Sequence, residues 1–254
     1  MTDALTAKGI YKSYGEIPVL KDVHINIAPG TTHAVIGPNG AGKTTLFKVL
    51  SGEIFADAGS VDFFGRDISR MPGYERVRQG IGRTFQVARV FGEMSVLENL
   101  VIALESRARF AREPGAGHLG VAPSPATHTE ALRILETVEL GARVGEIAAV
   151  LAYGERKRLE LALALALRPR MLLLDEPMAG MSPADRLGAV ALLKKIAKAQ
   201  SMSILLTEHD MSVVFALADQ VTVLNYGEVI ASGTPEQVRS SALVREIYLG
   251  QEHA

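Results

Sequence analysis

Hydrophobic and polar residues follow two different periods along the chain. GIYKSYG (9–15) and VLKDVHINIAPG (19–30) carry apolar residues at alternate positions and end in turn-forming residues, which is typical of β-strands. THAVIG (32–37) is a short and mostly apolar run that ends in glycine, which predicts a buried strand. From Lys43 the pattern KTTLFKVLSG becomes helical and stops at Gly52.

The middle of the chain mixes both periods. GSVDFFGRDI (59–68) and GIGRTFQ (80–86) indicate further strands, the second ending at Gln86. SVLENLVIALESRARF (95–110) has apolar residues at helical spacing. Ser95 is a candidate N-cap for that helix, because Glu98 follows it by three residues.

Residues 111–129 are rich in glycine, proline, alanine and small polar residues, which predicts a flexible surface loop. TEALRILETVEL (129–140) then indicates a helix.

The last hundred residues alternate between the two kinds of element. We expect a helix at 154–167, a strand at 171–175, a helix at 183–199, a strand at 203–209, a helix at 210–218, a strand at 220–225, a hairpin at 227–233 and a short terminal helix. Strands that alternate with helices predict an α/β fold with a parallel sheet covered on both faces.

Composition narrows the class of protein. The 254 residues carry a formal net charge of −1, so no global attraction to nucleic acid or anionic lipid is expected. The sequence has no cysteine, which excludes disulfides and Cys-ligated zinc. Its N-terminus has no apolar signal core. The long uncharged run at 23–42 is interrupted by Pro29, Gly30 and Gly37, so it is not expected to span a bilayer. We therefore expect a soluble, cytoplasmic protein.

The segment GPNGAGKTT (37–45) matches the spacing of a phosphate-binding loop, G-x-x-x-x-G-K-[ST], between a predicted strand and a predicted helix. Its glycines let main-chain N–H groups approach phosphates. Lys43 is expected to reach the β- and γ-phosphates, and the Thr44 hydroxyl to ligate Mg²⁺. The alternative is a glycine-rich turn that binds nothing. The residues assigned to ATP binding in this loop are Gly37, Pro38, Asn39, Gly40, Ala41, Gly42, Lys43, Thr44 and Thr45.

Polar residues follow two other predicted buried strands. Asp175, at the end of MLLLD, is suited to hold Mg²⁺, and Glu176 beside it to polarise an attacking water. A strand that happens to end in solvated acids is the alternative. His209 follows SILLTE, at the edge where ligands of open α/β sheets collect, and a neutral imidazole there could reach a γ-phosphate and sense its loss. The alternative is an ordinary surface or core histidine.

These motifs occur in one order: the phosphate loop, Gln86, LAYGE (151–155), MLLLDEP and TEHD. The chain thereby resembles the ATP-binding cassette ATPase of an ABC transporter. The resemblance implies a P-loop NTPase fold with a mixed, largely parallel β core, an antiparallel β subdomain and a helical subdomain. It also implies one nucleotide-binding domain over 1–254, with the helical subdomain inserted at approximately 87–159.

The resemblance assigns roles that the residue pattern alone does not. Gln86 would contact Mg²⁺ and the attacking water. Tyr14, in KSYGE, would stack on adenine, although Tyr11 is a rival for that contact and either ring could simply cover a sheet edge. In this family the nucleotide lies between two cassettes. The turn expected to face the partner's γ-phosphate consists of Leu151, Ala152, Tyr153, Gly154 and Glu155.

The helix that follows this turn is also expected to have a purely structural role. Its Leu and Ala residues, Leu159, Leu163, Ala166 and Leu167, are expected to pack in the core.

Two segments depart from the common family pattern. The turn lacks the serine of LSGGQ because Ala152 takes its place, which removes one hydroxyl contact, and Tyr153 and Glu155 also differ. MAGMSP (178–183) resembles the loop that crosses the dimer interface, with Ala179–Met181 in place of the commoner residues of SALD. These departures favour an asymmetric pair of cassettes.

Four segments narrow the resemblance: GIGRTFQVARVFGEMSVLENLVIAL (80–104), LAYGERKRLE (151–160), DEPMAGMSP (175–183) and YLG (248–250). They make the chain similar to the LivG-type ATP-binding subunit of high-affinity branched-chain amino acid importers. That resemblance implies a second, different ATPase subunit, two membrane permeases and an indirect substrate-binding protein, with this chain peripheral at the cytoplasmic face of the inner membrane. Residues 87–98, including Phe91 and Met94, would receive a permease helix, or would be only a surface of the helical subdomain.

Several other functions stay open. Related cassettes serve urea, amides, aromatic acids or lipopolysaccharide export. An ABC ATPase that acts on DNA or ribosomes and a non-hydrolysing regulatory partner are further alternatives. The missing basic patch and cysteines argue against the DNA or ribosome reading, so no nucleic-acid partner is expected.

Overall fold

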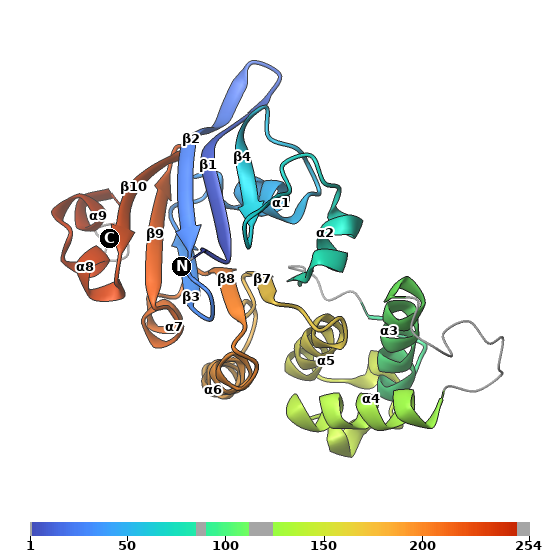
Figure 1. The fold of residues 1–254 in the computed structure, drawn as a ribbon. Coiled ribbons are helices and arrows are strands. Elements are labelled where there is room, and N and C mark those ends of the chain that lie inside the picture. The colour runs from blue at the N-terminus through green and yellow to red at the C-terminus, as the bar shows by residue number, and fades with distance from the viewer. Residues whose placement is uncertain (1, 85–89, 112–123, 248–254) are drawn as a thin grey trace.

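The computed structural model describes residues 2–84, 90–111 and 124–247, and it contains two β-sheets (Figure 1). The larger sheet has the strand order β10-β9-β3-β8-β7-β6. Its strands are β3 (Thr32–Ile36), β6 (Ile81–Arg83), β7 (Met171–Asp175), β8 (Ser203–Thr207), β9 (Gln220–Asn225) and β10 (Glu228–Gly233). All neighbours pair in parallel except the hairpin of β9 and β10. The predicted parallel core is therefore confirmed.

The smaller sheet is antiparallel and has the order β2-β1-β4-β5. It consists of β1 (Leu5–Tyr14), β2 (Ile17–Ile27), β4 (Ala58–Phe63) and β5 (Arg66–Asp67). The segment GSVDFFGRDI thus contributes two short strands rather than one, because Phe64 and Gly65 turn the chain between them.

Two apolar cores account for this arrangement. β3, β7 and β8 are buried at every position, as expected for parallel strands covered on both faces. One face packs with Leu46, Phe47 and the antiparallel sheet. The other face packs with the helices that follow β6. The carboxyl ends of the central strands are left at one edge, where polar residues gather.

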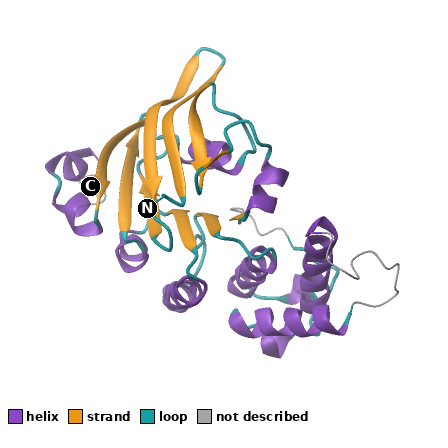
Figure 2. Ribbon diagram, viewed as in Figure 1, coloured by secondary structure: helices purple, strands orange, loops and turns teal. Residues whose placement is uncertain are grey.

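Helices occupy the space around the sheets (Figure 2). They are α1 (Lys43–Ser51), α2 (Gly73–Gln79), α3 (Val96–Ala111), α4 (Pro125–Thr137), α5 (Tyr153–Ala166), α6 (Pro183–Gln200), α7 (Met211–Leu217), α8 (Pro235–Ser240) and α9 (Ala242–Ile247). Two 3-10 turns, η1 (Gly141–Arg143) and η2 (Ala148–Val150), precede α5.

Helices α3, α4 and α5 pack on one another at one side of the molecule (Figure 1). The predicted cap of α3 is confirmed, because Glu98 accepts from the Ser95 N–H at 2.7 Å and Ser95 Oγ accepts from the Glu98 N–H at 3.2 Å. In α5, Leu159 and Ala166 are fully buried, whereas Leu163 and Leu167, the residue that follows the helix, are only partly buried. The boundary of a helical subdomain at 87–159 stays a prediction. None of the helices in the described ranges is long and apolar enough to cross a membrane.

The structure corrects several predicted boundaries. α4 begins at Pro125 and not at 129, because Ser124 caps it and proline fits the first helical turn. The strand predicted over 80–86 ends at Arg83, and the one predicted over 203–209 ends at Thr207. α5 begins at Tyr153, one residue earlier than expected.

Helix α2 was not predicted, because its buried side chain is an arginine. Arg76 is 1% exposed and donates to the main-chain oxygens of Val49, Leu50 and Ile68 at 2.7–2.8 Å. The helix is therefore docked by hydrogen bonds and has no apolar stripe for the periodicity to reveal.

Candidate functional site

The phosphate-binding loop connects the end of β3 to the start of α1, as its motif requires. Gly37 has φ 149° and Gly42 has φ 103°, a region that side chains other than glycine rarely adopt. A Cβ on Gly37 would collide with the main-chain oxygen of Leu224, and one on Gly42 would lie 2.9 Å from the main-chain oxygen of Val19. The loop therefore needs glycine here for its own fold as well as for close approach to a ligand.

Lys43 folds back over this loop. Its Nζ donates to the main-chain oxygens of Gly37 at 2.7 Å and Pro38 at 3.1 Å, and the residue is 7% exposed. Burial lowers the pKa of Lys43, while the nearby charges of Glu176 and Asp175 oppose that shift. The ammonium and the two carboxylates, far apart in the sequence, thus belong to one electrostatic group.

Asp175 ends β7 in a buried position, 7% exposed. Its register partner on β8 is Thr207, whose hydroxyl donates to Asp175 Oδ1 at 2.8 Å. Arg83 on β6 places Nη2 3.9 Å from Asp175 Oδ2. Sequence reasoning missed both partners, because neither belongs to a recognisable motif around Asp175.

Glu176 has a left-handed backbone, with φ 48°. Such a conformation is uncommon for a residue with a side chain and needs support from its surroundings. The support comes from Thr207, whose main-chain oxygen and Oγ1 accept the Glu176 N–H at 3.2 and 3.1 Å. The Glu176 carboxylate also contacts Nε2 of His209, which is a half-exposed side chain. The structure thus brings the two candidate catalytic side chains together.

The turn Leu151–Glu155 opens α5. Ala152 occupies the N-cap position but has no side-chain acceptor, so the Glu155 carboxylate alone completes the cap by accepting the Ala152 N–H at 3.0 Å. Glu155 also accepts from Nε of Arg143 at 3.0 Å. Glu155 is therefore held in a structural role within its own chain, while a Cβ on Gly154 would meet no atom within 4 Å.

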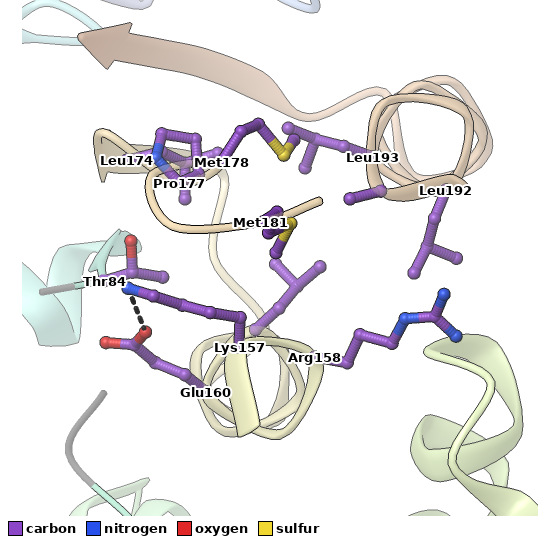
Figure 3. Close-up of a pocket in the computed structure, with 12 residues that line it drawn as sticks. Thr84, Lys157, Arg158, Glu160, Leu174, Pro177, Met178, Met181, Leu192 and Leu193 are labelled. Atoms are coloured by element: carbon purple, nitrogen blue, oxygen red, sulfur yellow. Dashed lines mark hydrogen bonds and ion pairs between the residues drawn. The ribbon is translucent and has the colours of Figure 1, made fainter. Parts of the chain in front are cut away.

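A pocket lies between α5, the chain that follows β7, and α6 (Figure 3). Met178 and Met181 point into it from the loop after Glu176, and Leu192 and Leu193 line it from α6. On its other side, Lys157 Nζ lies 3.4 Å from Glu160 Oε2 beside Thr84. The loop 177–182 is thus anchored by its methionines in an apolar space beside α5.

The remaining candidate residues are the two tyrosines proposed for adenine and the segment proposed for permease contact. Tyr14 is 49% exposed at the end of β1, and Tyr11 is 45% exposed, so both rings are accessible. Gln86 and residues 87–89 lie outside the described residues. Phe91 is 55% exposed, and Met94 is half-buried.

The donor set fits a nucleotide with Mg²⁺. Thr44 and Asp175 offer oxygen ligands, and Mg²⁺ commonly takes one or two protein oxygens, with phosphates and water completing its shell. In the described ranges, no group of three or more His, Cys, Asp or Glu residues is placed to enclose a metal by itself.

Comparison with known proteins agrees with this geometry. Residues 20–179 match the ABC transporter family, and residues 228–254 match the branched-chain amino acid ATP-binding cassette transporter family. The chain belongs to the ATP-binding subunits of ABC transporters, a family of nucleotide-binding ATPases.

Individual relatives refine this placement. BraF of Pseudomonas aeruginosa PAO1, a high-affinity branched-chain amino acid transport ATP-binding protein, is 36% identical, over 97% of this chain and 98% of BraF. LivG of Escherichia coli K12, with the same description, is 34% identical over 97% and 98% of the two chains. The lipopolysaccharide export ATP-binding protein LptB of Acidithiobacillus ferridurans is 32% identical, over 99% of both.

Solved structures confirm the fold. The crystal structure of an ATP-binding cassette of an ABC transporter in its ADP conformation superposes with a TM-score of 0.86 at 31% identity, over 98% of this chain and all of that one. A nucleotide-free ATP-binding cassette gives a TM-score of 0.82 at 31% identity, over 97% and 98% of the two chains. The predicted P-loop ABC ATPase fold is therefore confirmed.

Proposed function

We propose that this chain hydrolyses ATP to energise a membrane importer of branched-chain or related amino acids. The observation that carries the hydrolytic part is the contact between Glu176 and His209, in which Glu176 also belongs to the electrostatic group of Lys43. In this proposal Glu176 activates the nucleophile, Lys43 binds phosphate and His209 senses the γ-phosphate.

Each residue then has a role in cleavage. The loop 37–45 wraps the phosphates, Lys43 neutralises the β- and γ-phosphates, and Thr44, Asp175 and Gln86 would hold Mg²⁺, which supplies further charge neutralisation. Tyr14 would stack on adenine.

Glu176 orients a water and accepts its proton as the water oxygen attacks the γ-phosphorus. The bond from that phosphorus to the bridging oxygen of ADP breaks, and the proton passes on to the phosphate.

A complete site needs a second cassette. Gly154 lies at the open N-terminus of α5, where main-chain N–H groups and the helix dipole favour an anion. In this proposal the turn Leu151–Glu155 faces the γ-phosphate held by the partner cassette. Because Ala152 lacks a hydroxyl, main-chain groups would carry that contact.

The import reading is supported by the relatives named branched-chain amino acid transport proteins and by the family match at 228–254. It implies two permease subunits, a second and different ATPase subunit, and an indirect substrate-binding protein, with this chain on the cytoplasmic face of the inner membrane. The exposed Phe91 lies in the segment proposed to receive a permease helix. Lipopolysaccharide export is the second candidate, supported by LptB.

Two measurements test the proposal. The first is purification of the tagged chain from its native membranes, where two multi-spanning permeases and a different cassette are expected to copurify. Recovery of only self-associated chain, or of ribosomal proteins, would contradict import.

The second measurement is ATP hydrolysis by the purified complex. Glu176→Gln is expected to bind ATP while hydrolysing it very slowly, because the amide accepts no proton. Glu236→Gln, an exposed acid on α8, is the matched control that should retain turnover. Loss of labelled leucine uptake with Glu176→Gln would link hydrolysis to transport, whereas unchanged turnover would remove Glu176 from its role.

A further inference from the structure

Glu208 is a buried acid directly before His209. It is 4% exposed, and burial raises its pKa, an effect to which the nearby charge of Glu176 adds. Main-chain N–H groups of Met178, His209 and Asp210 oppose that rise by stabilising the charged form. A carboxylate in such a position is costly to bury unless its oxygens are well satisfied.

The two carboxylate oxygens of Glu208 bind two different segments. Oε1 accepts the N–H of Met178 at 3.1 Å, two residues after Glu176. Oε2 accepts the N–H of His209 at 3.2 Å. One side chain therefore links the chain that carries the candidate base to the chain that carries the candidate phosphate sensor.

These bonds close a ring of contacts around the two catalytic side chains. The Glu176 N–H is held by Thr207, the Met178 N–H by Glu208, and the Glu176 carboxylate meets the His209 imidazole. The segments 176–178 and 207–209 are thus joined at three points. Because Glu176 has the uncommon φ of 48°, its side-chain direction depends on these attachments.

The far end of the same loop is held from the other side of His209. Asp210 pairs with Arg186, and Arg186 Nη2 donates to the main-chain oxygen of Met181 at 3.3 Å. Asp210 also caps α7 by accepting the Ser212 N–H at 2.8 Å. Glu208 and Asp210, the neighbours of His209 in the sequence, are therefore both connected to the loop 177–182.

We propose that Glu208 is a positioning residue for ATP hydrolysis, which holds Glu176 and His209 in contact by bridging the N–H groups of Met178 and His209. This inference rests on the proposed function, in which Glu176 activates the attacking water. Each of the two oxygens accepts one of these N–H groups. A glutamine of the same size has one acceptor and would turn its amide N–H₂ group toward the second N–H.

Hydrolysis by the purified full complex tests the proposal through Glu208→Gln. We expect kcat to fall about 10- to 100-fold, since small displacements of catalytic groups have effects of that order, while the affinity for ADP stays within about twofold of wild type. Glu208→Asp should not restore the rate, because its shorter carboxylate cannot span both N–H groups. Glu236→Gln serves as the control acid, with wild-type turnover expected.

A second readout is independent of turnover. The imidazole ¹³C signals of His209 can be assigned with a His209→Gln variant, since the chain has only six histidines. Loss of the contact with Glu176 is expected to shift these signals in Glu208→Gln toward the positions they take in Glu176→Gln. A merely structural Glu208 would lower thermal stability and leave both kcat per folded protein and these signals unchanged.

The outcomes separate the two proposals. If Glu176→Gln abolishes turnover but Glu208→Gln changes neither kcat nor the His209 signals, the positioning role is overturned and the proposed function stands. If Glu176→Gln itself keeps wild-type turnover, the proposed function fails, and the positioning role fails with it. A large loss of kcat in Glu208→Gln, with the shifted His209 signals, supports both.

Discussion

The hydroxyl-bearing edge of the Tyr153 ring packs against Gly180. A Cβ built on Gly180 would come 3.2 Å from Cε1 of Tyr153 and 3.5 Å from its hydroxyl oxygen. Gly180 also has φ +75°, a conformation that favours glycine. Tyrosine stands where LSGGQ has glycine, and Gly180 stands where SALD has alanine, so the two departures fit each other.

This contact joins the turn that opens α5 to the loop that follows Glu176. In the proposed dimer, the turn faces the partner's nucleotide, while the loop belongs to the chain's own catalytic group. We therefore expect that a displacement of the turn Leu151–Glu155 is passed through Tyr153 to the loop 177–182.

Gly180→Ala should reduce hydrolysis severalfold while leaving ADP affinity within about twofold, because its methyl displaces the Tyr153 ring and its φ is strained by about 1 kcal/mol. The double variant Tyr153→Gly, Gly180→Ala should recover part of the loss, since the ring is gone while the strain stays. Steady-state ATPase rates and ADP titration measure both effects.

The matched control is Gly188→Ala on α6. A Cβ there meets only Arg158 Nη2 at 3.8 Å, an ordinary contact, and alanine suits a helix. Equal losses from Gly180→Ala and Gly188→Ala would contradict the role given to Tyr153.

Lys43→Ala should abolish detectable nucleotide binding, because the ammonium that lies over the phosphate loop is removed. Lys48→Ala, on the same helix but paired with Glu53, should bind ATP like wild type. Isothermal titration with ATP compares them. If Lys43→Ala retained micromolar affinity for ATP, the proposal that the loop 37–45 binds the phosphates would be contradicted.

Tyr14→Ala should weaken ATP binding by about 1–3 kcal/mol if its ring stacks on adenine. Tyr14→Phe should keep wild-type affinity, because stacking needs the ring and not the hydroxyl. Tyr11→Ala, with a similarly exposed ring, is the matched control. An effect confined to Tyr11→Ala would transfer the stack to that residue.

Ala152→Ser should stabilise the protein by about 1 kcal/mol, because it supplies the side-chain acceptor that α5 lacks at its N-cap. Ala152 has φ −60° and ψ 159°, close to the φ −62° and ψ 155° of Ser182, which caps α6 by accepting the Asp185 N–H. Chemical denaturation should show a gain for Ala152→Ser.

Ser182→Ala is the reverse experiment and should lose a similar free energy of unfolding. If Ser182→Ala is destabilising while Ala152→Ser has no effect, the cap of α5 is already complete through Glu155 alone.

His33 should make the protein less stable in mild acid. It is 3% exposed on β3, and burial lowers its pKa from 6.5 to about 4. Above pH 6.5 both folded and unfolded states hold it neutral. As the pH falls toward 4, only the unfolded chain takes up the proton, so the free energy of unfolding drops by about 3 kcal/mol over that window.

His33→Gln tests this because it does not titrate, and its amide can still reach the Thr222 hydroxyl, which lies 2.8 Å from His33 Nε2. Urea denaturation at pH 7 and pH 4.5 should show a stability difference between variant and wild type that shifts in favour of the variant at low pH. The difference cancels other titrating groups, including Glu208, whose raised pKa acts in the opposite direction. If the free energies of unfolding of wild type and His33→Gln changed in parallel with pH, the lowered pKa of His33 would be contradicted.

The sequence by itself determined the elements whose signals are local. The phosphate loop is a contiguous motif between a strand and a helix, and Gly37, Lys43 and Thr44 follow from its spacing. The strand ending at Asp175 was readable because parallel strands buried on both faces are continuous apolar runs. Such local patterns carry their own physical explanation.

Only the tertiary structure decided which distant residues complete the site. Glu208 bridges to Met178, 30 positions away, and Arg186 reaches Asp210 across 24 positions. No periodicity marks these side chains, because each is fixed by partners that only the packing of distant strands and helices brings together. Helix α2 was not predicted for the same reason: the buried guanidinium of Arg76 donates hydrogen bonds to main-chain oxygens of other segments. Hydrogen bonds from polar side chains to remote segments leave no trace in local hydrophobicity, and they become visible only when the chain has folded.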